Sequence, residues 1–317
     1  MTNLRSVAPM IASESSLPPT QEGSEVLTPN RHEQGAPTKA RPGARSVIKK
    51  HPLVAFFVLA YALSWWPWPL YAAGVPGEPF LAFGPLVAAV IVVGLTAGRP
   101  GLRVLAARMF RWRVGWRWYA VALALPLTVD ALASAINVAL GAPAPTFGPG
   151  APWYSVIMVF AIRLVNPLDG PLGEEPGWRG FALPNLQVTR SPLIATTILA
   201  LLVTGWHLPL VLGSGSNPLP PFALLGTFAG TFWFTWVFNH TNGSVLLTLI
   251  MHAADATLFG LLTAGLGRAD LERALLLKVV LVCVVTIGLC VFDRQAWRFP
   301  APALARSNIS NRQKNEN

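Results

Sequence analysis

The sequence predicts an all-α fold: a polytopic membrane helical bundle of about eight transmembrane segments, preceded by a disordered N-terminal tail. Hydrophobic residues make up 53% of the 317 residues and charged residues only 12%, whereas soluble domains carry roughly 25% charged residues. The mean hydropathy is +0.48. From residue 52 onward the chain is divided into apolar runs of about twenty residues, which is the length needed to cross a hydrocarbon core about 30 Å thick.

The first segment, residues 1–50, differs in composition from the rest of the chain. It is rich in Ser, Thr, Pro, Gly, Glu and basic residues, shows no apolar periodicity and has no hydrophobic stretch near its start. Such a composition is typical of a disordered tail and not of a signal peptide. We therefore expect a disordered basic cytoplasmic tail over 1–50, a transmembrane helical domain over 51–295 and a polar C-terminal tail over 296–317.

The apolar runs are interpreted as eight membrane-spanning helices: 52–73, 79–98, 118–141, 153–170, 192–213, 220–239, 244–266 and 275–292. Eight crossings return both termini to the same side of the membrane. Basic residues precede the first run, follow the last and gather in the connection 99–117. The alternate connections 74–78, 142–152 and 214–219 contain none, whereas 267–274 contains Arg268 and Arg273. By the positive-inside tendency the chain is predicted to be a multi-pass protein of the cell membrane with both termini in the cytoplasm.

The net charge of +10 raises the question of nucleic-acid binding. The arginines lie beside apolar runs and have no nucleic-acid-binding module around them, so anionic membrane lipid is the expected partner and nucleic acid is not. Segment 101–120 mixes arginines with tryptophans, a pattern typical of a helix that lies in the membrane interface.

Two adjacent glutamates, Glu174 and Glu175, interrupt the apolar part of a chain that has only 14 acidic residues. A carboxylate at the centre of a membrane helix costs about 2.5–3.5 kcal/mol, so acids at this depth usually have a function. Arg179 follows Glu175 at the helical spacing of an ion pair. We therefore expect Glu175 to hold Arg179 and Glu174 to be available for chemistry.

Two histidines from later runs, His207 and His252, are the candidates to meet Glu174. A helix over about 171–187, followed by a tight turn, would place Glu174 and His207 each roughly 24 Å from that turn and so level with each other. His252 lies about 10 Å out of this register, which helix tilt must absorb. This arrangement requires the fourth apolar run to be broken or re-entrant.

These groups suit hydrolysis of a peptide bond inside a membrane, which needs an activated water molecule and a stabilised oxyanion. Glu174 could remove a proton from the water. His207 and His252 could bind zinc together with Glu174, leaving one position open for water. Alternatively, the two histidines could donate hydrogen bonds to the oxyanion with no metal present. The sequence does not distinguish these two mechanisms.

Three motifs resemble the signatures of a known family. Residues 174–179 (EEPGWR) resemble its first signature, Glu-Glu-x-x-x-Arg; residues 206–209 (WHLP) resemble its second, around a histidine; and residues 251–254 (MHAA) resemble the start of its third, His-x-x-x-Asn. These are signatures of the CPBP family, which includes the type II CAAX prenyl proteases and Abi-like bacteriocin-processing or immunity proteins. Their order and spacing agree over a core of roughly 155–260.

The resemblance implies a membrane-embedded endopeptidase that acts on a membrane-associated or prenylated peptide. By this resemblance Glu174 would activate the water, and Glu175 and Arg179 would support Glu174. His207 and His252 would be the remaining catalytic groups, or would bind zinc with Glu174.

Two positions depart from the family pattern. Val203 stands where the second signature has an aromatic residue, and Ala256 stands where the third has asparagine, with Asp255 beside it. An amide donor at an oxyanion contributes about 3 kcal/mol. The loss of this donor therefore favours an alternative, a non-catalytic immunity or scaffold protein of the same fold.

A transporter is a third, lower-ranked hypothesis. Asp130, Glu174 and His252 would then form a proton path through the membrane. Many transporters contain inverted repeats, and the sequence shows none.

Overall fold

The computed structural model describes residues 43–146, 154–213 and 218–298, and every regular element in these ranges is helical, which confirms the all-α prediction. The helices before residue 147 are α1 (Ala44–Lys50), α2 (Pro52–Trp65), α3 (Pro67–Ala72), α4 (Gly84–Met109) and α5 (Trp116–Ala139). The middle part contains α6 (Ser155–Val165), α7 (Gly170–Gly177), a π-helical turn (Trp178–Ala182; the π-turn), α8 (Leu183–Gln187), α9 (Pro192–Trp206) and α10 (Leu208–Leu212). The last part contains α11 (Ala223–His240), α12 (Val245–Thr263), α13 (Arg268–Phe292) and a 3₁₀ turn (Arg294–Trp297).

In the described ranges, 7 helices are long and apolar enough to cross a membrane, one fewer than the sequence predicts. The difference is the run 220–239, which folds as α11 but contains glycine, threonine and asparagine residues that lower its hydropathy. The chain is therefore a membrane protein with several spanning helices. The cytoplasmic placement of both termini assumed an even number of crossings and stays a prediction.

Helical structure extends beyond the transmembrane domain boundaries that composition predicts. Helix α1 lies inside the segment 1–50, and its Ile48 packs against the main hydrophobic cluster. At the other end Trp297 is buried and its Nε1 donates to the carbonyl of Leu289 at 3.1 Å. In both places an apolar side chain holds the adjoining backbone to the bundle. The remainder of the predicted tails, 1–42 and 299–317, lies outside the described residues.

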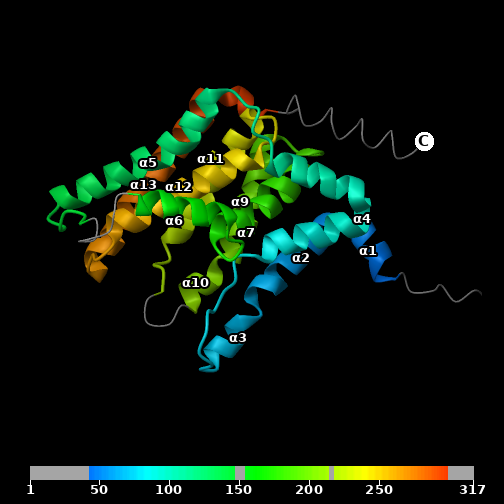
Figure 1. Cartoon of the computed structure of the whole chain (residues 1–317), viewed down its shortest axis with the longest axis horizontal. Coiled ribbons are helices and arrows are strands. Elements are labelled where there is room, and N and C mark those ends of the chain that lie inside the picture. Colours follow the sequence, from blue (N-terminus) through cyan, green and yellow to red (C-terminus); the bar gives the residue numbers. More distant parts are fainter. Residues whose placement is uncertain (1–42, 147–153, 214–217, 299–317) are drawn as a thin grey trace, which may run out of the picture. The chain divides into compact units, whose positions relative to one another are not determined.

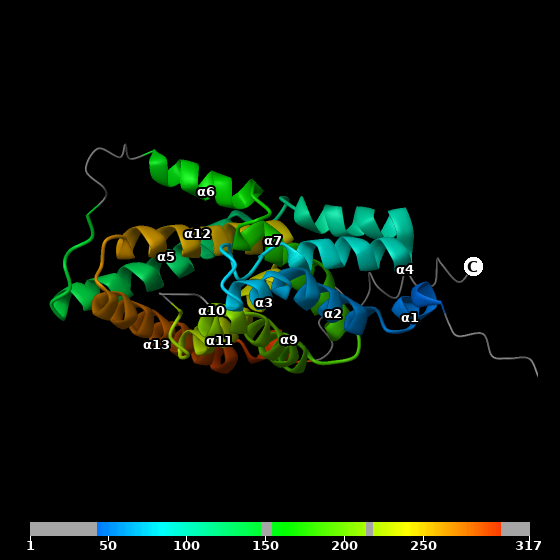
Figure 2. The ribbon, with the colours of Figure 1, turned by 90° about the horizontal axis from the view of Figure 1, so that it is seen from below.

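Helix α4 folds back on itself at Gly98, whose φ of 60° lies in the left-handed region that favours glycine. Residues 84–97 and 99–109 therefore form two arms that lie side by side (Figures 1 and 2). The predicted interfacial helix over 101–120 is not one continuous helix. Its first part belongs to the second arm of α4, residues 110–115 are not helical, and its last part begins α5.

The fourth apolar run is broken, as the sequence argument requires. Helix α6 ends at Val165, and α7 begins after Asp169, whose side chain caps the new helix by accepting from the N–H of Gly170 at 2.9 Å. Pro171 lies in the first turn of α7, where a missing N–H costs little. Arg163 of α6 forms an ion pair with Asp169 at 2.9 Å across the break. Helix α6 has no buried residue, whereas α7 is largely buried.

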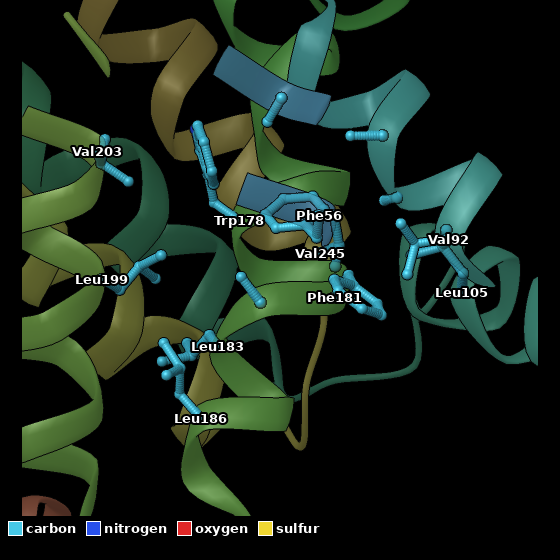
Figure 3. Packing of buried hydrophobic residues seen from close by; sticks show 14 of the residues in the cluster. Phe56, Val92, Leu105, Trp178, Phe181, Leu183, Leu186, Leu199, Val203 and Val245 are labelled. Carbon is cyan, nitrogen blue, oxygen red and sulfur yellow. The ribbon is translucent and has the colours of Figure 1, made fainter. Parts of the chain in front are cut away.

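The largest hydrophobic cluster packs around the continuous helix that runs from α7 through the π-turn into α8 (Figure 3). Trp178 and Phe181 of the π-turn lie against Phe56 of α2, with ring centroids 5.5 and 5.0 Å apart. Leu183 of α8 and Leu199 of α9 belong to the same cluster. Because Trp178 and Phe181 lie within two turns after Glu175 on the same continuous helix, this packing fixes the helix that carries the two glutamates.

Helices α5, α11, α12 and α13 form a second packed group. Helix α5 runs along α12 and α13, and α13 also packs against α11 (Figure 1). Between α11 and α12 the chain turns at Asn242 and Gly243, both of which have positive φ. Helix α12 additionally packs against α7, so it connects the second group with the helix that carries the two glutamates.

Candidate active site

Five residues selected from the sequence line one cavity of about 360 Å³: Glu174, Glu175, Arg179, His207 and His252. Helix α7 and the π-turn supply the two acids and the arginine, His207 follows the last residue of α9, and α12 supplies His252. The structure therefore brings together side chains from three segments that are far apart in the chain.

Glu175 lies at the centre of this group, and its side chain has 0% exposure. Its Oε1 accepts hydrogen bonds from Nη1 of Arg179 at 2.9 Å and from Nδ1 of His252 at 3.1 Å. The guanidinium of Arg179 also lies over the ring of Phe234, 4.5 Å from its centroid. Removing a carboxylate from water costs several kcal/mol unless such partners compensate. Glu175 thus holds Arg179, as the sequence predicts, and in addition orients His252.

The bond to Glu175 determines which nitrogen of His252 faces the cavity. A carboxylate only accepts hydrogen bonds, so Nδ1 carries a proton and Nε2 is the outward nitrogen. A Cβ placed on Gly170 would lie 3.2 Å from this Nε2 and 3.0 Å from Oε1 of Glu174. The two atoms therefore border the same small space, which the absence of a side chain at Gly170 keeps open.

Glu174 is only 6% exposed. Its Oε2 accepts a hydrogen bond from Nε1 of Trp178 at 3.3 Å, one turn along the same helix. One carboxylate oxygen is thus held by the helix itself, while the other borders the space shared with His252.

His207 is the C-cap of α9, and its Nδ1 donates to the carbonyl of Val203 at 2.8 Å. The rings of Trp206 and Phe80 lie 4.9 and 6.2 Å from the imidazole, centroid to centroid. Backbone and aromatic contacts therefore hold this ring, and Nε2 is the nitrogen opposite the backbone bond.

The predicted zinc set of Glu174, His207 and His252 is not assembled in this structure. Across the described part of the chain, no three His, Cys, Asp or Glu side chains are grouped closely enough to hold a metal ion. Each imidazole is instead fixed by its own Nδ1 hydrogen bond, to Glu175 in one case and to a backbone carbonyl in the other. In their neutral forms both rings would still present at Nε2 the lone pair that zinc binds.

Residues 152–258, which contain all five of these residues, match the model of the type II CAAX prenyl endopeptidase Rce1-like family. We refer to residues 152–258 as the Rce1-like domain, after the family that they resemble. This match confirms the resemblance to CPBP and CAAX proteases that the three motifs indicate. No curated protein matches the chain significantly.

The two departures of the Rce1-like domain from the family signatures have different consequences. Val203 is buried, at 3% exposure, and anchors His207 through its carbonyl, a contact that does not depend on the side chain. Ala256 has no side-chain donor, so an amide donor at that position is lost. A side-chain hydrogen bond to an oxyanion would therefore have to come from another residue.

A second ionic cluster reaches the same cavity. Lys278 of α13 forms ion pairs with Asp130 of α5 and Asp255 of α12, with N–O distances of 2.9 Å in both. Its Nζ also lies 4.2 Å from the centroid of Phe259. Asp255 and Lys278 line the cavity, whereas the side chain of Asp130 has 0% exposure.

The sequence shows Asp130 and Asp255 as isolated acidic residues but does not identify their partner. The three residues of this cluster lie on three helices, so their spacing in the chain contains no signal. The presence of single charged residues within apolar runs was the available clue. Phe234, which contacts Arg179 from α11, was missed for the same reason. Gly170 lies one turn before Glu174 on α7, but its closeness to His252 depends on the packing of α12.

Proposed function

We propose that the Rce1-like domain is an intramembrane endopeptidase in which Glu174 activates a water molecule. The observation that supports this most directly is the space beside Gly170 that Glu174 Oε1 and His252 Nε2 share. A water molecule in this space gives a proton to Glu174, and its hydroxide attacks the carbonyl carbon of the peptide bond. Glu174 then passes the proton to the departing nitrogen, so that one water is consumed for each bond broken.

The charges around this space suit that reaction. Glu174 and Glu175 carry two negative charges and Arg179 carries one positive charge, so a second proton on His252 balances the group. The imidazolium then donates from Nε2 to the oxyanion, a contact of the kind that contributes a few kcal/mol to catalysis. His207, whose Nδ1 is bonded to a backbone carbonyl, accepts a hydrogen bond from the attacking water at Nε2. This division of roles requires no zinc ion and no asparagine at position 256.

The substrate that we propose is a membrane-associated or prenylated peptide. Apolar side chains from α11 and α13 form much of the cavity lining beyond the polar residues, and they suit a peptide with apolar side chains. The name of the matching family, a CAAX prenyl endopeptidase, favours a prenylated one.

The substitution Glu174→Gln tests this mechanism. An amide cannot take the proton, so cleavage of an internally quenched farnesylated CAAX peptide in proteoliposomes should fall by about 10²- to 10⁴-fold. The matched control is Glu272→Gln, because Glu272 is 40% exposed on α13 and should leave cleavage unchanged. Wild-type activity in folded Glu174→Gln protein would refute the mechanism.

A second candidate function is a non-catalytic immunity or scaffold protein, and Ala256 is the observation that favours it. In that case the wild-type protein cleaves nothing, and protection of cells against a bacteriocin survives Glu174→Gln. Loss of protection in this variant, at equal protein level in the membrane, would count against the scaffold.

A further inference from the structure

One backbone carbonyl of the π-turn lacks its usual helical donor. In an α-helix the carbonyl of Gly180 would accept from the N–H of residue 184, but that residue is Pro184, which has no N–H. Gly180 is buried and directly follows Arg179. A buried carbonyl requires a hydrogen bond from some other donor.

Arg108, in the second arm of α4, supplies such a donor. Its Nη1 donates to the carbonyl of Gly180 at 2.7 Å, although the two residues are 72 positions apart. Leu105, one turn earlier on the same arm, packs against Gly180 so closely that a Cβ there would lie 2.6 Å from its Cδ1. The second arm of α4 is therefore docked on the π-turn by one hydrogen bond and one apolar contact.

Arg108 belongs by composition to the basic residues beside the membrane, which are expected to face lipid headgroups. Arg108 differs from these basic residues in its burial. Arg103, on the same arm, is exposed, whereas Arg108 is only partly exposed. The hydrogen bond to the π-turn directs its charge into the protein.

We infer that Arg108 is a positioning residue for the active site, an inference that rests on the proposed function. Gly180 adjoins Arg179, whose guanidinium bonds to Glu175, and Glu175 in turn bonds to His252. A displaced π-turn would therefore misplace the group that orients His252 in the reaction. Arg108 lies outside the matching segment 152–258, so the family match does not identify it.

Three variants test the inference in the proteoliposome assay: Arg108→Ala, Arg108→Lys and, as matched control, Arg103→Ala. Small misplacements of catalytic groups cost up to about 100-fold, so we expect Arg108→Ala to lower kcat by roughly 10- to 100-fold with KM within about twofold. Arg108→Lys retains an N–H donor and should recover part of kcat. Arg103→Ala removes the same charge and should change neither constant. Equal kcat in Arg108→Ala and Arg103→Ala would overturn the inference.

A second measurement does not depend on activity. Hydrogen–deuterium exchange of the full-length variants in nanodiscs should show faster exchange over 178–187 in Arg108→Ala than in Arg103→Ala, because the π-turn has lost its contact with α4. Unchanged exchange there would overturn the inference, whatever the activity. If the wild-type protein cleaves nothing while exchange increases as expected, the proposed function fails and the contact that positions the π-turn stands.

Discussion

The two ionic clusters that reach the cavity are built in opposite ways. In the first, the acid Glu175 lies between Arg179 and His252. In the second cluster, the cationic side chain of Lys278 lies between Asp130 and Asp255. The residues of the first cluster come from neighbouring turns of one helix and from a single position of α12. The residues of the second cluster come from three helices, α5, α12 and α13.

We propose that the first cluster supports a reacting group, whereas the second cluster attaches helices to one another. Beside the first cluster lies Glu174, whose Oε1 borders open space next to His252. In the second cluster the lysine contacts both carboxylates and the ring of Phe259. We therefore expect loss of the first cluster to reduce both stability and hydrolysis, and loss of the second to reduce stability alone.

The largest effect is expected for Arg179→Met. This change leaves the fully buried Glu175 carboxylate without its cationic partner, and such a loss costs about 3–5 kcal/mol. Hydrolysis should also be lost, because Arg179 no longer fixes the Glu175 carboxylate that orients His252. Thermal unfolding in detergent and cleavage per folded molecule measure the two effects. Normal turnover by the folded variant would show that the first cluster is not part of the catalytic arrangement.

Lys278→Met should destabilise by a similar amount, about 3–5 kcal/mol, because two carboxylates lose their shared cation. Turnover per folded molecule should stay within about threefold of wild type, the range expected of a change that leaves the reacting groups in place. Adding Asp130→Asn and Asp255→Asn to this variant should restore part of the stability. A large drop in turnover of the folded protein would assign the second cluster a part in the reaction.

Gly170→Ala should affect activity more than stability. The new methyl group would lie 3.0 Å from Glu174 and 3.2 Å from His252, in the space that we assign to the reacting water. We expect cleavage to fall by about 10- to 100-fold and the unfolding temperature to change little. Gly260→Ala is the matched control, because a Cβ there has no neighbour within 4 Å. Equal cleavage by both variants would place the reacting water elsewhere.

The smallest effect is expected from metal removal. In the proposed mechanism, prolonged treatment with a chelator leaves cleavage within about twofold of the untreated protein, because Glu174 activates the water without a metal. Loss of activity that is restored by zinc alone would favour the alternative in which Glu174, His207 and His252 bind the ion.

The parts of the site that the sequence predicted are those fixed by local geometry. The Glu175–Arg179 pair follows from spacing within a helix, and the presence of Glu174 and His207 in one cavity agrees with two helices of similar length joined by a short turn. The break before α7 was predictable because it is marked by glycine, proline and a capping aspartate.

The remaining features depend on contacts between distant segments. Lys278 could not be assigned to Asp130 before α5 and α13 were placed side by side. The second apolar run was predicted to end at Gly98, but the direction in which the chain continues depends on the left-handed conformation of this glycine. Arg108 was read as a lipid-facing residue because the carbonyl that it reaches lies on a helix much later in the chain.

The π-turn also determines how the faces of α7 and α8 are rotated relative to each other around the helix axis. A π-turn contains one residue more than an α-helical turn, and each residue of an α-helix advances by about 100° around the axis. The extra residue lets the acids face the cavity while Leu183 and Leu186 face the apolar interior. A deletion of one residue after Arg179 within the π-turn should therefore be tolerated better than a deletion within α7 or α8, because the π-turn can close to an α-helical turn and keep both faces in their environments.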